Sequence, residues 1–168
     1  MKNNVAYVIR QMTEIANHSP VKKALQKMVF LIERKGVNLG FKYMLHFYGP
    51  YCPELDHETA VLSGKGVISF IYGQYGHNMN ITDEFKDIES ENLVESQQKI
   101  IQSVINRYKN YSASELELLT TAIYVYDYTG ARTRKAISDN VKKIKGEKYS
   151  DIEIEKEINE FSYFGIAV

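Results

Sequence analysis

The chain of 168 residues has no tryptophan, a single cysteine and only three prolines. One cysteine excludes an intrachain disulfide framework and is typical of proteins from a reducing compartment. No stretch approaches the ~18–20 apolar residues that a membrane-spanning helix needs, and the first residues lack the continuous apolar run of a signal peptide. These absences predict a cytoplasmic protein that does not associate with membranes.

An excess of one charge is also lacking, because 21 Lys and Arg balance 21 Asp and Glu. Residues 1–50 hold 8 basic and 2 acidic residues, residues 51–100 hold 3 and 9, and residues 132–148 hold 7 and 2. A general nucleic-acid-binding domain is usually clearly basic, so the composition does not predict one. Opposite blocks of charge can steer a charged partner or pair with a second copy of the chain, and a homodimer is among the expectations.

Patterns that carry chemistry are scarce. Cys52 is the one candidate nucleophile, with His46 or His57 as its base, but a lone cysteine near histidines is more often a packed thiol. The four histidines match no compact metal-ligand spacing. The glycines at 64–66 and 73–76 form neither a dinucleotide-binding nor a P-loop pattern. We therefore predict no catalytic residues, no metal and no cofactor, and a protein that is not an enzyme.

The clearest pattern covers residues 19–55. Ser19 can cap a helix and Pro20 suits its first turn. Apolar residues then recur at helical spacing as far as Ile32, and Gly36 ends the helix. The sequence places four polar residues largely off this apolar face: Lys22, Lys23, Gln26 and Lys27.

A strand and a third helix are expected next. Alternation of Phe41, Tyr43, Leu45 and Phe47 predicts a strand, which ends at the turn 48–51. Pro53 then begins a helix that reaches about residue 63.

The rest of the chain predicts a hairpin followed by helices. Residues 67–72 and 77–81 alternate as strands around the turn Gly73-Gln74-Tyr75-Gly76. A long helix should end near Tyr108, and residues 133–145 form a basic amphipathic helix. Two capping boxes, at 112–115 and 150–153, predict further helix starts.

The order of elements predicts an α+β fold that is mainly α. Two helices, a strand, a helix and a hairpin give a winged-helix-like part over residues 1–82, packed on a helical part over 83–168, and we expect one compact unit.

Leu25-Gln26-Lys27 within a helix, the following aromatic strand that closes on Tyr48-Gly49-Pro50-Tyr51, and then Glu54-Leu55 resemble the SocA-like (Panacea) antitoxin domain family. Within this family the chain looks closest to the YwgA-like branch. The resemblance extends weakly through residues 62–68, the hairpin and residues 119–165. It implies a non-enzymatic regulatory module, often an antitoxin, and carries no catalytic residues over to this sequence.

Two surfaces follow as candidates for binding. Acidic residues on the third helix and tyrosines at the turn before it can meet a basic, partly apolar protein surface, such as that of a toxin. The residues of this partner surface are Tyr48, Tyr51, Glu54, Asp56 and Glu58. Contact with DNA would instead use two basic helices, because the third helix of the winged-helix arrangement is acidic. The DNA candidates are Lys22, Lys23, Lys27, Arg132, Arg134, Lys142, Lys143 and Lys145.

The leading hypothesis is a non-enzymatic regulatory module, an antitoxin or adaptor that acts by binding another protein. The alternative is a winged-helix DNA-binding transcriptional regulator.

Overall fold

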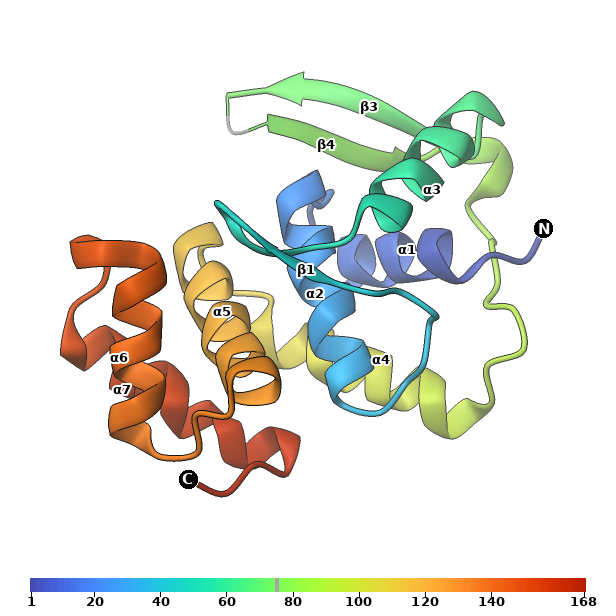
Figure 1. Ribbon diagram of the computed structural model, residues 1–168. Coiled ribbons are helices and arrows are strands. Elements are labelled where there is room, and N and C mark those ends of the chain that lie inside the picture. Colours follow the sequence, from blue (N-terminus) through green and yellow to red (C-terminus); the bar gives the residue numbers. More distant parts are fainter. Residues whose placement is uncertain (75) are drawn as a thin grey trace. The chain divides into compact units, whose positions relative to one another are not determined.

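The computed structural model describes residues 1–74 and 76–168. Within these residues the chain forms seven α-helices and two small antiparallel hairpins (Figure 1), so the predicted α+β, mainly α class is confirmed. None of the helices in the described residues is long and apolar enough to cross a bilayer.

Contacts divide the chain into two units. Unit 1 consists of Met1–Tyr43 and Cys52–Tyr111, and unit 2 of Met44–Tyr51 and Ser112–Val168. The short segment Met44–Tyr51 therefore belongs with residues more than sixty positions further along the chain. The expected division into domains at residue 82 stays a prediction, as does the winged-helix assignment.

Unit 1 contains α1 (Asn4–Ala16), α2 (Lys22–Arg34), α3 (Pro53–Gly64), α4 (Glu95–Tyr108) and the hairpin of β3 (Ile68–Gly73) and β4 (Gly76–Ile81). A single 3₁₀ turn, η1 (Asp83–Phe85), follows the hairpin. Asn3 caps α1, since its side-chain oxygen accepts a hydrogen bond from the Ala6 N–H at 2.9 Å. The predicted hairpin strands are confirmed, although Tyr75 at its turn lies outside the described residues.

Strand β4 lies between β3 and the helices α1 and α2 (Figure 1). The Met79 N–H donates to the Pro20 carbonyl at 2.9 Å, which joins β4 to the segment before α2. The Met79 side chain is fully buried. The core of unit 1 thus forms where the apolar faces of the helices meet the inner face of the hairpin.

Two local predictions for α2 are wrong. The helix begins at Lys22 with Val21 as N-cap, and the Ser19 hydroxyl donates to the Asn80 side chain instead of capping the helix. Gln26 and Lys27 are buried, at 6% and 5% exposed, although the spacing placed them off the apolar face. The apolar face of α2 is wider than its hydrophobic residues indicate, because other elements cover its polar positions too.

The predicted aromatic strand is shorter than the alternation suggests. Only Met44–His46 forms β1, which pairs with β2 (Gly49–Tyr51). Tyr43 belongs to unit 1, where its ring meets that of Phe30 edge-on with 5.1 Å between centroids. The alternation ends because the chain passes from one unit to the other between Tyr43 and Met44.

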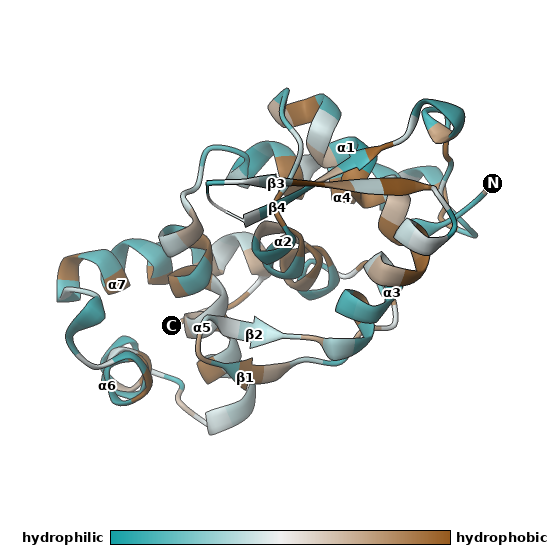
Figure 2. Cartoon of the chain, turned by 90° about the horizontal axis from the view of Figure 1, so that it is seen from above, coloured by the Kyte–Doolittle hydropathy of each residue, from teal (hydrophilic) through white to brown (hydrophobic). Residues whose placement is uncertain are grey.

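Unit 2 contains the β1–β2 hairpin, α5 (Ala113–Thr129), α6 (Arg134–Lys145) and α7 (Asp151–Ile158), with 3₁₀ turns η2 (Gly146–Lys148) and η3 (Asn159–Phe164). Both predicted capping boxes are confirmed, at Ser112 with Glu115 and at Ser150 with Glu153. Helix α6 has a hydrophobic and a hydrophilic side (Figure 2), and the buried residues Ile137 and Val141 lie on the hydrophobic one.

Candidate protein-binding site

The β1–β2 hairpin of unit 2 exposes large apolar side chains. Met44 is opposite Tyr51 and His46 is opposite Gly49, so Phe47 and Tyr48 form the turn. Phe47 is 86% exposed, Tyr48 52% and Met44 51%. We call the turn residues Phe47 and Tyr48 the hairpin tip. Aromatic side chains of this size are typical anchors of protein interfaces, because they bury a large area at a low cost in conformational entropy.

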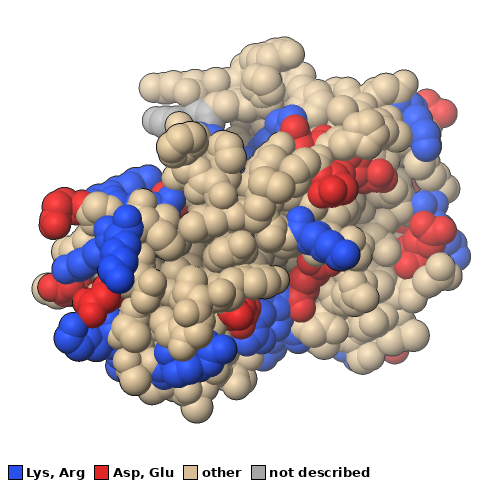
Figure 3. All heavy atoms as spheres, in the orientation of Figure 1, with Lys and Arg blue, Asp and Glu red and all other residues tan. Residues whose placement is uncertain are grey.

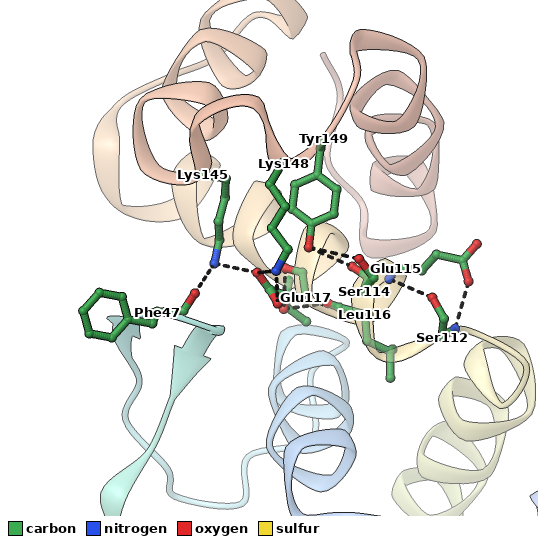
Figure 4. A network of polar contacts seen from close by, with 10 residues as sticks. Phe47, Ser112, Ser114, Glu115, Leu116, Glu117, Lys145, Lys148 and Tyr149 are labelled. Atoms are coloured by element: carbon green, nitrogen blue, oxygen red, sulfur yellow. Dashed lines mark hydrogen bonds and ion pairs between the residues drawn. The ribbon is translucent and has the colours of Figure 1, made fainter. Parts of the chain in front are cut away.

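A buried lysine holds the turn of this hairpin in place. The Lys145 ammonium donates to the Phe47 carbonyl oxygen at 2.6 Å (Figure 4). The same ammonium lies 2.7 Å from Glu117 Oε1, and the two side chains are only 4% and 7% exposed. Lys148 donates to both oxygens of the Glu117 carboxylate, at 2.9 and 3.0 Å. One carboxylate of α5 thus positions a lysine of α6, and that lysine fixes the backbone of the hairpin tip.

Glu117 stays ionised at neutral pH in this arrangement. Burial by itself would raise the pKa of the carboxyl, but the hydrogen bonds and positive charges of Lys145 and Lys148 outweigh it and hold the pKa below its ordinary value. The hydrogen bond to Glu117 raises the pKa of Lys148 in turn. The contacts of this carboxylate with both lysines make the network a charge-assisted link between α5, α6 and the hairpin.

Gly49 allows the hairpin to approach α5 closely. Its φ of +88° lies in the left-handed region that side chains other than glycine rarely adopt. A Cβ atom at this position would lie 3.0 Å from Thr121 Oγ1 and 3.4 Å from Glu117 Cγ. Glycine is thus required at position 49 both by the backbone conformation and by the close contact with α5.

Within unit 1, Gln26 links α2 to the segment that follows Tyr51. Its side-chain amide donates to the Cys52 carbonyl and accepts from the Cys52 N–H, each at 2.9 Å. A glutamine can satisfy both backbone groups of one residue in this way, as a neighbouring strand would. The helix motif 25–27 and the motif 48–55 therefore meet through the pair of Gln26 and Cys52.

Glu33 shapes the loop that leads to β1. One of its carboxylate oxygens accepts the N–H groups of Leu39 and Phe41, at 2.9 and 3.0 Å. Burial raises the pKa of this carboxyl, and the backbone hydrogen bonds partly oppose the shift. The loop after α2 is thus ordered by a side chain of the helix itself.

The acidic residues predicted for partner binding lie on α3, in unit 1. Glu54 is exposed, and hydrogen bonds from its own N–H and from the Cys52 thiol lower its pKa. Asp56 pairs with Lys22 at 2.6 Å, and Glu58 accepts a hydrogen bond from the Asn3 side chain at 2.8 Å. The carboxylate of Glu54 is therefore the most accessible of the three, because Glu54 is exposed whereas Asp56 and Glu58 are half-buried.

The predicted tyrosines are in unit 2. Tyr48 belongs to the exposed hairpin tip, whereas Tyr51 is half-buried and its ring lies 5.4 Å from that of His46. Their assignment to a partner surface stays a prediction.

The candidate thiol nucleophile is enclosed. Cys52 is fully buried, burial raises the pKa of its thiol, and its Sγ donates to Glu54 Oε2 at 3.2 Å. His46 lies on β1 and His57 on α3. In residues 1–74 and 76–168, no three side chains of His, Cys, Asp and Glu gather as metal ligands would.

Most of the predicted DNA-binding cations have acidic or carbonyl partners. Lys22 pairs with Asp56, Arg134 with Glu155, Lys142 with Asp151 and Lys145 with Glu117. Arg132 donates to the carbonyls of Tyr126 and Ala131, and Lys27 is buried. Lys23 and Lys143 are exposed. On the face drawn in Figure 3, blue atoms of unit 2 lie beside red ones, so its positive charge is interspersed with negative charge. DNA binding through these residues stays a prediction.

Sequence reasoning missed the residues that position the hairpin tip. Glu117 lies within an otherwise apolar run of α5, and an acidic residue at such a position is a signal for a buried charge with a partner. Nothing in the spacing shows that its partners are Lys145 and Lys148, because the three residues meet only when α5 and α6 pack. The predicted strand includes Met44 and Phe47, and its alternation does not indicate that both side chains are exposed.

Comparison with known proteins gives one finding. No curated protein matches the chain. A family model described as "Antitoxin SocA-like, Panacea domain" matches residues 25–122, which is well over half of the chain. The matched range runs from the motif 25–27 through the hairpin tip to the part of α5 that carries Glu117. The chain therefore belongs to the SocA-like antitoxin family with the Panacea domain.

Proposed function

We propose that the protein is an antitoxin that works in the cytoplasm by binding a toxin protein, and that it catalyses no reaction. Membership of an antitoxin family supports the role. The observation that carries the mode of action is the exposed hairpin tip, whose backbone is fixed by the Lys145–Glu117 network.

Preorganisation explains why a fixed tip suits binding. An apolar side chain that is already held in position loses less conformational freedom when a partner covers it, so more of the burial energy appears as affinity. Full burial of a phenylalanine side chain contributes ~1.5–3 kcal/mol. Phe47 and Tyr48 are then the anchors of this interface.

The experiment begins with affinity purification of tagged chain from its native cells, with nuclease treatment to remove nucleic acid. The captured protein is identified and expressed alone in a bacterial host, then together with the wild-type chain or with variants. We expect that the captured protein stops growth, that wild type restores it, and that Phe47→Ala with Tyr48→Ala fails to do so.

Tyr128→Ala serves as the matched control, because Tyr128 is 65% exposed on α5 but lies outside the hairpin tip. This variant should restore growth as wild type does. A captured protein that is harmless when expressed alone would refute the antitoxin role. Full rescue by the double variant would refute the hairpin tip as the binding surface while leaving the role intact.

A further inference from the structure

The outer edge of β3 has unpaired backbone groups. The Met79 N–H points away from β3, toward the Pro20 carbonyl, and Met79 is opposite Phe70. In an antiparallel pair, both members of such a position direct their N–H and C=O groups outward. At the other end of the strand, the Thr82 N–H donates to the Val67 carbonyl. This bond places the hydrogen-bonded and the outward-facing positions of β3 in the same alternating order. The backbone N–H and C=O groups of Phe70 and Tyr72 therefore point to the outer edge, where no residue in 1–74 or 76–168 binds them.

This edge lacks the features that normally prevent strand addition. Edge strands in natural proteins carry charged residues, prolines or bulges that oppose pairing with another chain. Neither β3 nor β4 contains a charged residue or a proline, and their register has no bulge. Ile71 and Tyr72 are 57% and 78% exposed. Figure 2 shows much of β3 as hydrophobic, and Figure 3 shows neither basic nor acidic atoms over the hairpin at the top of the view.

We infer that β3 pairs with β3 of a second copy of this chain, so that two hairpins form one four-stranded antiparallel sheet. A two-fold axis at Ile71 places Ile71 opposite itself, Phe70 opposite the partner's Tyr72, and Ser69 opposite the partner's Gly73. The outward groups of Phe70 then exchange both hydrogen bonds with those of the partner's Tyr72, and the symmetric pair does the same.

The side chains fit this register on both faces of the sheet. Ile71 meets its own copy at a position without hydrogen bonds, where opposite side chains approach most closely. Phe70 and the partner's Tyr72 form cross-strand aromatic pairs on the other face. Ser69 and Gly73 are small and do not obstruct the pairing. A second copy fits because it brings an identical strand that contains no charged residue.

A disulfide test examines the register directly. The Cα atoms of the two Ile71 residues should be ~4.5 Å apart, within the range that a disulfide bridges. Ile71→Cys should therefore form a covalent dimer under mild oxidation, seen as a doubled mass on a non-reducing gel. The native Cys52 does not compete, because it is fully buried.

Ser69→Cys is the matched control, since Ser69 is exposed on the same face of the same strand. The two copies of residue 69 would be offset by four residues along the strand, about 13 Å, which no disulfide spans. Cross-linking of both variants to the same extent, or of Ser69→Cys alone, would overturn the proposed register.

The second measurement is the mass in solution by sedimentation equilibrium. We expect wild type to form dimers of the 19.4 kDa chain, and Ile71→Lys to raise the dissociation constant at least ~10-fold because two like charges meet at the axis. Ile152→Lys, which changes an isoleucine 83% exposed on α7, should leave the dissociation constant unchanged. A wild-type chain that is monomeric at all concentrations would overturn the inference, whether or not the antitoxin role holds.

Discussion

At the scale of single residues, the most consequential group is the carboxylate of Glu117. It accepts hydrogen bonds from two lysines, and the side chain of Lys145 is 4% exposed. A buried charge is costly unless it is paired, so the position of the Lys145 side chain beside the Phe47 carbonyl depends on Glu117. The position of the hairpin tip therefore depends on one buried ion pair.

Replacing Glu117 by Gln should lower the free energy of unfolding by ~3 kcal/mol, because it leaves Lys145 as a buried charge without a counterion. Urea denaturation measures the change. Glu155→Gln is the control, since it breaks the Arg134–Glu155 pair, whose side chains are 41% and 47% exposed. Exposed pairs contribute ~0–1 kcal/mol, so a similar loss in both variants would contradict the special role of Glu117.

The lowered pKa of Glu117 predicts a dependence of stability on pH. A group whose pKa is lower in the folded state stabilises the fold above its ordinary value, here 4.5, and loses this contribution as the pH falls through the folded-state pKa. The difference in stability between wild type and Glu117→Gln should therefore be largest at neutral pH and shrink below 4.5. Urea midpoints of both proteins across this range test the prediction, and a difference that does not change with pH would contradict it.

At the scale of elements, the two hairpins differ in how they are held. The β1–β2 hairpin is fixed to α5 and α6 by Gly49 and Lys145, and it exposes its turn. The β3–β4 hairpin is fixed along β4 and leaves the edge of β3 open. The first therefore exposes large side chains, while the second exposes backbone groups.

Gly49→Ala should destabilise the chain more than Gly40→Ala. The two glycines have nearly the same φ, +88° and +87°, so both substitutions cost ~1–2 kcal/mol of backbone strain. Gly40 has no atom within 4 Å of the added Cβ, whereas Gly49 would meet Thr121 at 3.0 Å. We expect at least ~1 kcal/mol of additional loss at Gly49 from overpacking, measured by thermal or urea unfolding. Equal losses would show that the hairpin does not pack closely on α5.

At the scale of the whole molecule, basic and acidic residues are equal in number, and several of them form ion pairs. The net charge is zero, and several cations of the basic segment 132–148 pair with carboxylates of the same unit. Paired cations release few counterions from DNA, and such release is the source of non-specific affinity. These pairs therefore predict weak non-specific binding of nucleic acid by this segment.

We expect the chain to bind random duplex DNA no more tightly than ~10⁻⁴ M at physiological salt, the weak end of non-specific binding. Fluorescence anisotropy at two salt concentrations measures this affinity. Micromolar binding that falls steeply with salt, and that weakens in Lys23→Gln or Lys143→Gln but not in Lys99→Gln, would favour the DNA-binding alternative. Lys145 is unsuitable as a probe, because its neutralisation would disturb the network with Glu117.

Most of the helices, and many of their ends, can be predicted from residues that are close together in the chain. Capping boxes at Ser112 and Ser150 and the helical spacing of apolar residues in α2 and α6 act within a few residues, so they can be recognised without the fold. The family motif was also recognised from local residues. The predicted capping role of Ser19 is wrong, because its hydroxyl contacts Asn80 in a hairpin about sixty residues further along the chain.

Which side chains form the candidate site depends on how the elements pack in the folded chain. The segment 44–51 leaves the unit of its neighbours in sequence and joins residues 112–168, and this shortens the expected strand and exposes Phe47. The burial of Gln26, Lys27 and Glu117, and the pairing of Glu117 with Lys145, arise from elements that meet only in the folded chain. The physical reason is that burial and charge pairing are properties of packed elements, whereas helix limits depend on neighbours along the chain.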